Sequence, residues 1–456
     1  MASQRERLNL EEITSFAKRR GFVFQASEIY GGLAGFWDYG PYGVELVNNL
    51  KSAWWRAFVY RQTNIYGLDS AIIQHPKLWE ASGHVAGFVD PMIDCKACKH
   101  RFRADHIAGV DTTNLEELAK LLQNKACPNC GKEDTFTPPR QFNMMLTTHL
   151  GAVVDDSTKA YLRPETAGGI YVNYETVRET TRAKLPFGIA QIGKAFRNEI
   201  TPRDFIFRVR ELEQMEMQYF IAPEDREKEY ENWRAKTREF LIKDVGLQEK
   251  SLAWHEHGED ERAHYAAAAH DIYFNFPHGS KELAGIHDRT DHDLKAHIAA
   301  SGKDLTYFNQ ETGERFVPNV IESSMGVGRL FIAALTDAYD EEEVNGEMRT
   351  VLHLKSSIAP IKVAILPLSK KSELTEVARE IFADIAENWR CEYDDTQSIG
   401  RRYRRQDEIG TPLCVTVDFD SLNDQAVTVR ERDSMQQERI AIQDLSAYIE
   451  KFYRAN

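Results

Sequence analysis

The chain has 456 residues, of which 42% are hydrophobic and 28% are charged. This length exceeds what one simple core supports, and the composition is typical of a soluble protein with two or three domains. No apolar run approaches the roughly 20 residues of a membrane helix, so no membrane partner is expected. Residues 1–20 are charged and lack the apolar stretch of a secretory signal, which favours the cytoplasm. The net charge of -14 argues against nucleic acid binding by the whole surface, although a local basic stripe can still bind phosphates.

The N-terminal region is predicted to form a helix within residues 10–24 that ends at Gly21, followed by a glycine-rich stretch over residues 31–41. Glycines let the backbone turn sharply or approach another group closely. From Val44 to Tyr60 apolar residues, including Trp54 and Trp55, recur at helical spacing. We expect this second helix to pack in a core or at a subunit interface.

Four of the six cysteines form two Cys-x2-Cys pairs within an insertion-like segment, residues 92–138. A two-residue gap lets both thiolates of a pair reach one ion, and two pairs complete a tetrahedral zinc site. The alternative is a hairpin without metal. Nearby lysines are expected to favour the thiolates, and the other two cysteines are expected to be buried as small hydrophobic residues. The zinc ligands would be Cys95, Cys98, Cys127 and Cys130, the lysines are Lys96, Lys99 and Lys132, and the separate cysteines are Cys391 and Cys414.

Residues 188–193 and 215–220 are predicted strands, and residues 201–204 form a polar loop between them, which indicates an antiparallel pair. Arg197 and Glu199 are two residues apart, so on a strand they face one side, either as a ligand site or as a surface salt bridge. Alternate residues from 208 to 216 make a poor core face and a reasonable floor for a ligand. They are Arg208, Arg210, Leu212, Gln214 and Glu216.

Further along the chain, residues 224–243 are predicted to form an amphipathic helix in a second insertion-like segment, about 224–275. The histidines that follow form no His-Glu-x-x-His pattern, so we expect them to be solvated or hydrogen-bonded. Gly326 and Gly328 precede a helix beginning near Arg329, where backbone can approach a ligand. An acidic linker is predicted at 337–347. The histidines are His255, His257, His264, His270, His287, His292 and His297.

From Pro360 onward strands and helices alternate, which predicts a separate α/β domain over residues 360–456. Within it, residues 401–405 hold four arginines around Tyr403. Two interpretations remain open: a solvated helix face paired to Asp407 and Glu408, or a contact with nucleic acid in which Tyr403 stacks on a base. The arginines are Arg401, Arg402, Arg404 and Arg405.

Four short segments bring arginines and carboxylates into strand-forming or glycine-rich surroundings: 163–166, 196–199, 211–216 and 321–329. Arginine donates to phosphate and carboxylate oxygens in pairs and stays charged. Carboxylates hold a metal ion or an ammonium group. Together the segments predict a cleft for a small zwitterion and a polyphosphate.

In this order the segments resemble the three signature motifs of the class II aminoacyl-tRNA synthetases, and the chain looks most like the homodimeric glycyl-tRNA synthetases over nearly its whole length. The residues that carry the resemblance are Trp37-Asp38-Tyr39-Gly40-Pro41, Asn48-Asn49-Leu50, Trp54-Trp55, 102–106, Arg163-Pro164-Glu165-Thr166-Ala167, Phe196-Arg197-Asn198-Glu199, Arg208-Val209-Arg210-Glu211, Arg289-Thr290-Asp291, Asp293-Leu294, Val320-Ile321-Glu322 and Arg329.

The resemblance implies an α+β catalytic domain, residues 1–355, with a six-stranded antiparallel sheet flanked by helices, a zinc-ribbon-like insertion, and an anticodon-binding domain. ATP would lie bent on the sheet, with Arg197 at the α-phosphate, Arg329 over adenine and the γ-phosphate, and Glu282 holding Mg²⁺; these three would be the catalytic residues. The remaining ATP-binding residues would be Asn198, Glu199, Phe207, Arg208, Leu212, Leu283, Gly326 and Gly328. Leu212 replaces the family's adenine-stacking phenylalanine, and Gly168 replaces a glutamine.

Glycine would be bound by acidic groups that leave no room for a side chain, which makes editing unnecessary. The activity implied is ATP-dependent ligation of glycine to tRNA-Gly by a homodimer, with the basic cluster at the tRNA. The alternatives are a catalytically silent protein that binds RNA or a partner, a synthetase for another small amino acid, and an acid ligase that does not use tRNA. The implied glycine-binding residues are Arg103, Glu165, Glu216, Glu322 and Ser324.

Overall fold

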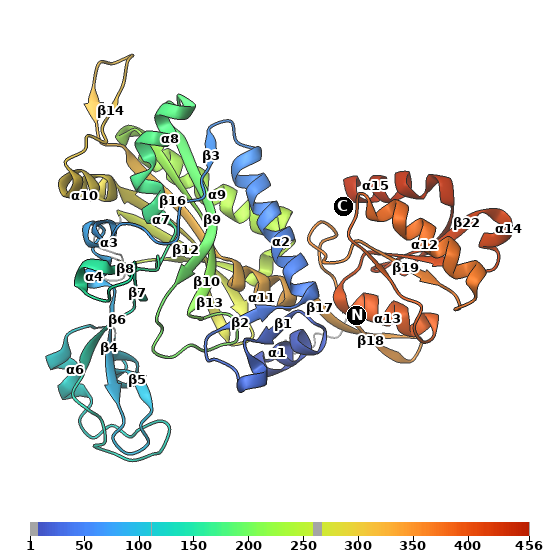
Figure 1. The fold of residues 1–456 in the computed structure, drawn as a ribbon, viewed down its shortest axis with the longest axis horizontal. Coiled ribbons are helices and arrows are strands. Elements are labelled where there is room, and N and C mark those ends of the chain that lie inside the picture. The colour runs from blue at the N-terminus through green and yellow to red at the C-terminus, as the bar shows by residue number, and fades with distance from the viewer. Residues whose placement is uncertain (1–7, 111, 259–266, 456) are drawn as a thin grey trace.

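The computed structural model describes residues 8–110, 112–258 and 267–455. Figure 1 shows a large body, a small lobe that projects from it, and a C-terminal domain on the opposite side. No helix in the described ranges combines the length and apolar character that a membrane crossing needs.

The large body is built on a seven-stranded sheet in which all neighbours are antiparallel except β9 and β3. The predicted antiparallel pairing of the strands around 188–193 and 215–220 is confirmed, since β9 and β10 lie side by side. In sheet order the strands are β11 (Leu252–Glu256), β12 (Ala268–Phe276), β13 (Gly279–Thr290), β16 (Asn319–Gly326), β10 (Glu211–Ile221), β9 (Phe187–Phe196) and β3 (Ile65–Gly67).

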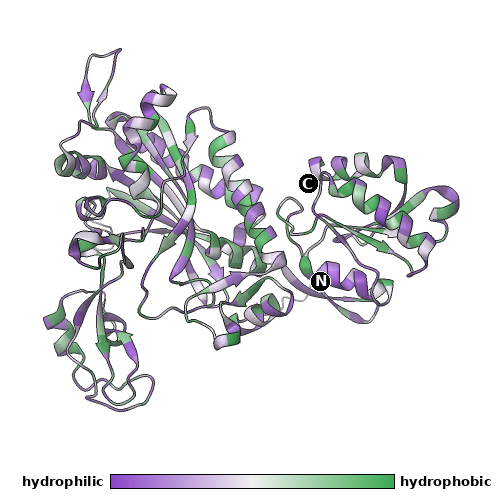
Figure 2. Cartoon of the chain, viewed as in Figure 1, coloured by the Kyte–Doolittle hydropathy of each residue, from purple (hydrophilic) through white to green (hydrophobic). Residues whose placement is uncertain are grey.

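Helices bury both faces of this sheet. On one face the main core contains fully buried Trp54, so this tryptophan belongs to a core. On the other face a second core surrounds Phe220. The helices on the first face are α2 (Pro41–Trp55, extended by a π-helical turn, Arg56–Tyr60), α9 (Arg226–Glu239) and α11 (Val327–Ala338), and those on the second are α7 (Ala167–Val172), α8 (Tyr174–Thr181) and α10 (His292–Ser301). Figure 2 shows hydrophobic and hydrophilic residues alternating along helix α2, as its position against the sheet requires.

Two segments differ from their description in the sequence analysis. The insertion-like segment 224–275 supplies α9, β11 and β12 to the body itself. The expectation of an acidic linker at 337–347 is wrong, because β17 (Tyr339–Val344) and β18 (Glu347–Leu352) form an antiparallel hairpin there. Its four acidic residues are consecutive along β17, so they face the two sides of the hairpin in turn, and Glu342 is paired with the buried Arg349.

The projecting lobe holds the cysteine pairs and a three-stranded sheet in the order β5-β4-β6. Its core is small, with Ile93, Leu118 and Leu122 at the centre. The lobe consists of β4 (Val89–Asp94), β5 (Arg101–Arg103), α5 (Ala104–Ala108), α6 (Leu115–Leu121) and β6 (Arg140–Asn143). At its base lie α3 (Pro76–Ala81), α4 (His84–Gly87), β7 (Thr147–His149) and β8 (Lys159–Tyr161). A separate hairpin of β14 (Tyr307–Phe308) and β15 (Arg315–Phe316) projects from another part of the body. At the N-terminus, α1 (Leu10–Arg19) precedes the hairpin of β1 (Val23–Gln25) and β2 (Trp37–Tyr39).

The C-terminal domain has its own core and a five-stranded sheet, parallel across β20, β19 and β21 and antiparallel across β22 and β23. The expected α/β domain is confirmed, and Cys391 and Cys414 are buried as expected. Its elements are β19 (Val363–Pro367), α12 (Ser372–Ala386), β20 (Cys391–Tyr393), α13 (Ile399–Ile409), β21 (Leu413–Val417), α14 (Ser421–Asp424), β22 (Ala426–Glu431), β23 (Gln437–Ala441) and α15 (Leu445–Ala455).

Candidate active site

A cavity of about 560 Å³ opens over the sheet of the large body. Its walls come from β9, β10, β13 and β16, from the first turn of α11, and from the segment around β2. Thirteen of the sixteen residues expected to bind glycine or ATP line it: Glu165, Arg197, Glu199, Phe207, Arg208, Leu212, Glu216, Glu282, Glu322, Ser324, Gly326, Gly328 and Arg329.

Arginines occupy one part of the cavity. Arg197 follows β9 directly, and its Nε donates to the carbonyl of Pro164 (3.0 Å), which fixes the guanidinium in place. Arg208 lies 3.8 Å from Glu199. Arg329 lies over the ring of Phe207, 4.4 Å from its centroid. Three fixed guanidinium groups in one cavity suit a ligand with several phosphate oxygens.

Glu282 and Arg329 form an ion pair (2.9 Å) at the edge of this arginine-rich part. The carboxylate is half exposed and lines the cavity. Mg²⁺ at nucleotide sites is usually held by one or two carboxylates together with the phosphates of the substrate. One accessible carboxylate beside phosphate-binding arginines therefore fits such an ion.

Carboxylates occupy the other part of the cavity, where the strand register brings them together. Glu216 pairs with Ser324 across β10 and β16, and Gln218 pairs with Glu322. The Gln218 amide donates to both acids, at 3.0 Å to Glu216 and 2.8 Å to Glu322. Tyr171 in turn donates to the Gln218 carbonyl oxygen (2.8 Å) and fixes the orientation of the amide.

Glu322 is surrounded by positive charge. Arg289 donates to one of its oxygens (3.0 Å), and His287 Nδ1 lies 2.9 Å from the other. Burial would raise the pKa of Glu322, but Arg289 and His287 together hold that pKa well below its usual value. Burial would lower the pKa of His287, whereas its hydrogen bonds to Asp271 and Glu322 raise it to about 10. Glu322 is thus an ionised carboxylate held by two cations.

The pKa of Glu216 is shifted in the opposite direction to that of Glu322. It is buried and accepts a hydrogen bond from Thr166. Burial, together with the charges of Glu322 and Glu165, raises its pKa to about 8. Burial likewise acts to raise the pKa of Glu165, but His84 at 3.3 Å outweighs it and holds that pKa below its usual value. The acidic part therefore holds two ionised carboxylates and one that carries a proton at neutral pH.

Several groups of this site were missing from the sequence analysis as functional residues. The most important are His287 and Arg289, which alternate along β13, and their supports Asp271, His257 and Asp293. Their alternation along one strand could have indicated that His287 and Arg289 share a face. Their contact with Glu322 follows only from the strand register, in which His287 pairs with Glu322. The expectation of hydrogen-bonded histidines holds for His257 and His287, while His264 lies outside the described residues.

Three residues expected in the site do not line the cavity. Arg103 remains in the lobe, where it pairs with Asp90 (3.0 Å) and Asp105 (2.5 Å). Leu283 is fully buried in the main core, because it follows Glu282 on a strand and so faces the opposite side. Asn198 lies between Arg197 and Glu199, which face the cavity, and its backbone N–H donates to the carbonyl of Met144.

Two further arginines near the site also differ from expectation. Arg210 does not line the cavity, although Arg208, Leu212, Gln214 and Glu216 do, because its guanidinium donates to the carbonyls of Glu199 and Ala34. Arg163 is buried beneath the cavity and donates to the carbonyls of Lys194 and Ser70. Gly193 makes this possible, because a Cβ there would lie 2.1 Å from the Arg163 guanidinium.

The two substituted positions have clear surroundings. Leu212 lines the cavity, as expected for the position at which the family has a phenylalanine that stacks on adenine. Gly168 lies against Leu78 and Trp79, and a Cβ at this position would be 2.8 Å from Leu78 and 3.0 Å from the Trp79 ring. A larger residue at 168 therefore requires a different packing of α3.

The basic cluster lies on α13, but its arginines do not share one exposed face. Arg402 is 1% exposed and donates to the carbonyls of Pro367, Asp394 and Gln397. Arg405 is paired with Asp394. The expectation that all four arginines contact tRNA is therefore wrong for Arg402, since α13 packs one side against its own domain.

The alternative interpretation of the cluster is also wrong in its partners. Asp407 pairs with Arg349 and Arg430, and Glu408 pairs with Arg20. Neither carboxylate neutralises the basic cluster. Arg401 remains exposed and Arg404 half-buried on α13.

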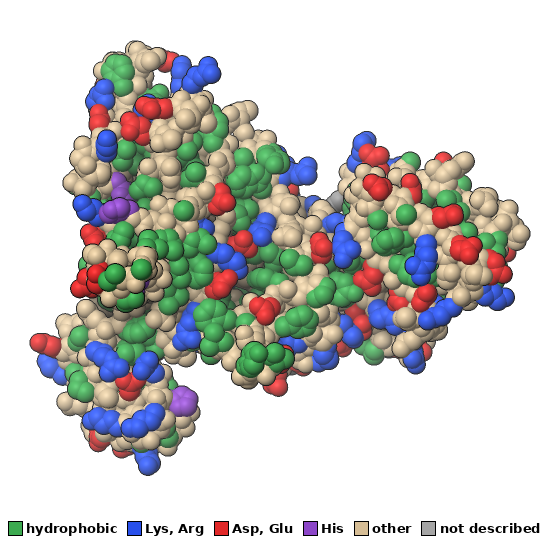
Figure 3. Space-filling model, viewed as in Figure 1, with side chains coloured by type: hydrophobic (Ala, Val, Ile, Leu, Met, Phe, Trp, Pro, Cys, Tyr) green, Lys and Arg blue, Asp and Glu red, His purple; other side chains and the backbone are tan. Residues whose placement is uncertain are grey.

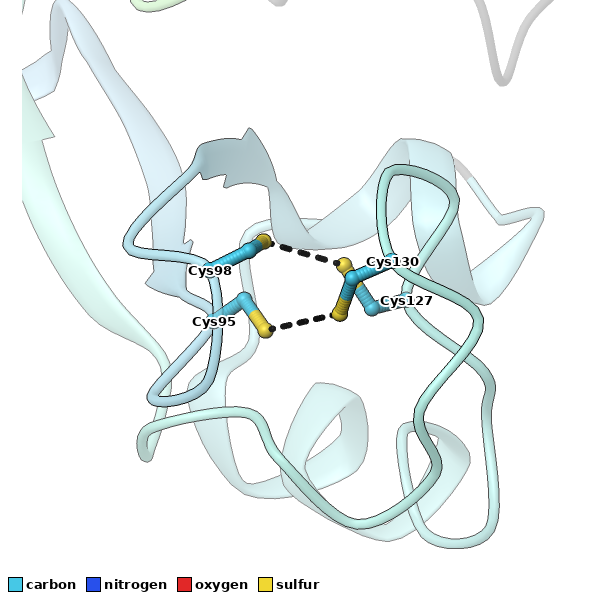
Figure 4. Close-up of side chains that lie close together, drawn as sticks. All are labelled: Cys95, Cys98, Cys127 and Cys130. Carbon is cyan, nitrogen blue, oxygen red and sulfur yellow. Dashed lines mark hydrogen bonds between the residues drawn. The ribbon is translucent and has the colours of Figure 1, made fainter.

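The four cysteines of the lobe converge, as Figure 4 shows. All four sulfurs lie within 4.8 Å of one another, with Cys95 to Cys130 at 3.8 Å and Cys98 to Cys127 at 3.7 Å. A tetrahedral zinc with Zn–S bonds of about 2.3 Å separates its sulfurs by about 3.8 Å, so the geometry fits zinc.

The expected help from lysines is not what favours the thiolates. A hydrogen bond from Thr135, followed by the backbone N–H of Cys98, lowers the pKa of Cys95 to about 6. The backbone N–H of His100 is the main group that lowers the pKa of Cys98. The thiolates of Cys95 and Cys98 are thus favoured by the local turns of the lobe.

Replacing Cys98 with serine is expected to abolish zinc binding and to make the lobe sensitive to protease, because its small core does not hold these loops together. Elemental analysis and limited proteolysis measure the two effects. Cys414→Ser is the control, since Cys414 is buried in the other domain, and it should keep one zinc per chain. A parent protein purified without zinc, and unable to take it up, would contradict the assignment.

The large body has a cavity lined by arginines and carboxylates over an antiparallel sheet, and a separate α/β domain follows it. This arrangement is that of a class II aminoacyl-tRNA synthetase. Two family matches agree with this class. Residues 152–339 match the family described as tRNA synthetase class II core domain (G, H, P, S and T), and residues 362–452 match the one described as anticodon binding domain.

Full-length relatives narrow the class further. The chain is 51% identical over 449 residues to the glycine–tRNA ligase of Treponema denticola, with 97% of each chain covered. It is 50% identical over 458 residues to that of Caldanaerobacter subterraneus subsp. tengcongensis (98% of each) and 51% identical over 445 residues to that of Borreliella burgdorferi (97% of each). The chain therefore belongs to the glycine–tRNA ligase family.

Proposed function

We propose that this chain activates glycine with ATP and transfers it to the 3′ end of tRNA-Gly. The observation that carries this proposal is the division of one cavity into an arginine part and a carboxylate part. The first matches the phosphates of ATP, and the second matches the ammonium group of a small amino acid. Membership of the glycine–tRNA ligase family supports the choice of glycine.

In the first step, a glycine carboxylate oxygen attacks the α-phosphorus of ATP, and the bond from that phosphorus to the bridging oxygen breaks as pyrophosphate leaves. Arg197, Arg208 and Arg329 hold the phosphate oxygens and stabilise the charge that develops on them. Glu282 would hold Mg²⁺, which neutralises charge on the phosphates. In the second step, a hydroxyl of the terminal adenosine attacks the carbonyl carbon of the glycyl-adenylate, the bond from that carbon to the phosphate oxygen breaks, and AMP leaves while the proton of the hydroxyl passes to the phosphate or to water.

Glycine selection follows from the carboxylate part. Glu165, Glu216 and Glu322 surround the ammonium group, with Ser324 beside them. Gln218 holds two of these acids in place, and their bulk would leave no room for a larger side chain at the α-carbon. Exclusion by size discriminates against every larger amino acid, so no separate editing site is required.

The glycine KM is expected to fall several-fold as pH rises from 6 to 8. Glu216, whose pKa is about 8, is mainly protonated at pH 6, and an ammonium ligand favours its ionised form. Binding of glycine should thus release a proton, and affinity should increase as the carboxyl ionises. Steady-state kinetics across this range measures the effect, and Glu216→Gln should remove the slope. An equal slope in both proteins would contradict this role for Glu216.

We further propose that the working form is a homodimer. Ile29 and Tyr30 are 88% and 86% exposed, and Val153 and Val154 are 60% and 76% exposed. Runs of exposed apolar side chains usually mark protein interfaces. Sedimentation equilibrium should give about twice the chain mass of 52.3 kDa. A monomer at micromolar concentration would contradict it.

The remaining parts of the proposal concern zinc, tRNA and location. Zinc would be held by the four lobe cysteines, and the C-terminal domain from about residue 360 would contact the tRNA through Arg401 and Arg404. Figure 3 shows further basic side chains grouped on the lobe. The exposed basic residues of the lobe include Lys96, Lys99 and Arg101. As a supplier of charged tRNA, the protein would act in the cytoplasm.

The direct test is ATP-dependent attachment of labelled glycine to a tRNA-Gly transcript, with alanine and serine as comparison substrates. The expected result is acid-precipitable label with glycine alone. Binding of tRNA without any attachment would favour the catalytically silent alternative, and attachment of alanine or serine at a comparable rate would favour a different substrate.

A further inference from the structure

Helix α13 connects the C-terminal domain to the large body. Its last residue, Ile409, is buried in the main core together with Leu352 and Leu354 of the large body. Gly410 follows with φ +80°, and a Cβ there would lie 2.9 Å from Leu354. The end of α13 is therefore fitted closely against the body.

A buried ion cluster lies at this junction. Asp407 of α13 is 0% exposed, accepts from Arg349 Nε (2.8 Å), and accepts from both terminal nitrogens of Arg430 (2.9 and 3.2 Å). Arg349 comes from β18, and Arg430 comes from β22. One carboxylate thus joins the hairpin of the body, the junction helix and the C-terminal sheet. Fully buried charges require this degree of compensation, and removing one partner is strongly unfavourable.

A second set of contacts surrounds the cluster. Glu408 pairs with Arg20 at the end of α1 (2.6 Å). Glu392 accepts from Tyr42 of α2 (2.8 Å) and from Gln406 of α13 (3.1 Å). Arg20 directly precedes the hairpin of β1 and β2, Tyr42 lies in the first turn of α2 directly after β2, and β2 lines the cavity.

The hairpin held by Asp407 is likewise continuous with the cavity. β17 begins directly after α11, and the first turn of α11 carries Arg329. α13 therefore contacts the hairpin and the end of α1, and its partner Glu392 contacts α2; these elements lie close in the chain to two walls of the cavity. Figure 1 shows α13 and β18 next to each other between the two domains.

We propose that α13 is a docking helix, and that Asp407, bound by Arg349 and Arg430, fixes the C-terminal domain in the orientation from which a bound tRNA presents its 3′ end at the cavity. Asp407, Arg349 and Arg430 are positioning residues for the transfer step and do not touch the reactants. This inference rests on the proposed function, because it assigns the second step a structural requirement that the first step lacks.

The test compares two reactions of the full-length protein: glycine-dependent ATP–pyrophosphate exchange, and glycylation of a tRNA-Gly transcript. Asp407→Asn is expected to leave exchange within about twofold of the parent and to lower kcat/KM for tRNA by roughly tenfold or more, since small misplacements of a reactant are costly. Asp424→Asn is the matched control, because Asp424 pairs with Arg439 inside the same domain and is half exposed. It should leave both reactions near the parent values.

Asp407→Asn risks misfolding, so the double variant Glu392→Gln with Glu408→Gln carries the test independently. It breaks the surrounding contacts without leaving Arg349 unpaired, and a smaller but selective loss of tRNA glycylation is expected. Equal loss of both reactions, or no loss in either, would overturn the docking role. A parent protein that performs exchange but no glycylation would instead refute the proposed function.

Discussion

Replacing Arg329 with alanine is expected to lower glycine-dependent ATP–pyrophosphate exchange by about 100- to 1,000-fold, the usual cost of losing one preorganised donor to a developing charge. Arg329 is fixed in the first turn of α11, over Phe207 and beside Glu282. The arginine is therefore in place before the substrate binds, and no other described group has this position.

Two further variants make this prediction specific. Arg329→Lys keeps the charge but loses the paired donors, so an intermediate rate is expected. Arg315→Ala changes an arginine that pairs with exposed Asp304 on a distant hairpin, and it should retain the parent rate. An Arg329→Ala protein with more than about a tenth of the parent rate would show that phosphate stabilisation does not depend on this residue.

Glu322→Gln is expected to raise the glycine KM by about 100-fold or more while the ATP KM changes little. Glu322 compensates Arg289 and the His287 cation, and loss of a buried partner of this kind costs roughly 3–5 kcal/mol. The same change should lower the free energy of unfolding, measured by chemical denaturation, because Arg289 and His287 each lose one of the carboxylates that pair with them.

The control for this variant is Glu239→Gln, which removes an exposed i, i+4 pair with Lys243. Such pairs contribute only about 0.3–0.5 kcal/mol, so both KM values and the stability should stay near the parent. If Glu322→Gln left the glycine KM unchanged, the carboxylate part of the cavity would have to bind something other than the amino acid.

Much of the catalytic part could be predicted from local patterns. The alternation around β9 and β10 gave the strands, their pairing and the side that carries Glu216, because side chains on a strand face opposite sides in turn. The cysteine spacing gave a cluster whose geometry suits zinc. These features depend on residues close in sequence.

The register between distant strands could not be predicted in this way. His287 and Arg289 meet Glu322 only because β13 lies beside β16; Arg289 belongs to the pattern of the resemblance, but that pattern gives it no partner, and His287 belongs to no motif. The same limitation affected Leu283, which was grouped with Glu282 although adjacent residues on a strand face opposite sides.

The basic cluster shows a different limitation. A run of arginines suggests an exposed face, but in α13 the two terminal nitrogens of the Arg402 guanidinium donate to three backbone carbonyls inside the protein. Composition cannot separate an arginine that meets RNA from one that closes a loop. The acidic run at 337–347 was misjudged for the same reason, since its charges are partly compensated by the distant Arg349.

The most direct measurement is glycine-dependent ATP–pyrophosphate exchange by the purified protein in the absence of tRNA, with alanine and serine compared at equal concentration. The account predicts exchange with glycine and almost none with the other two, because one cavity binds the phosphates and the small ammonium group together. Absence of exchange with every amino acid, in a protein that is folded and dimeric, would contradict it.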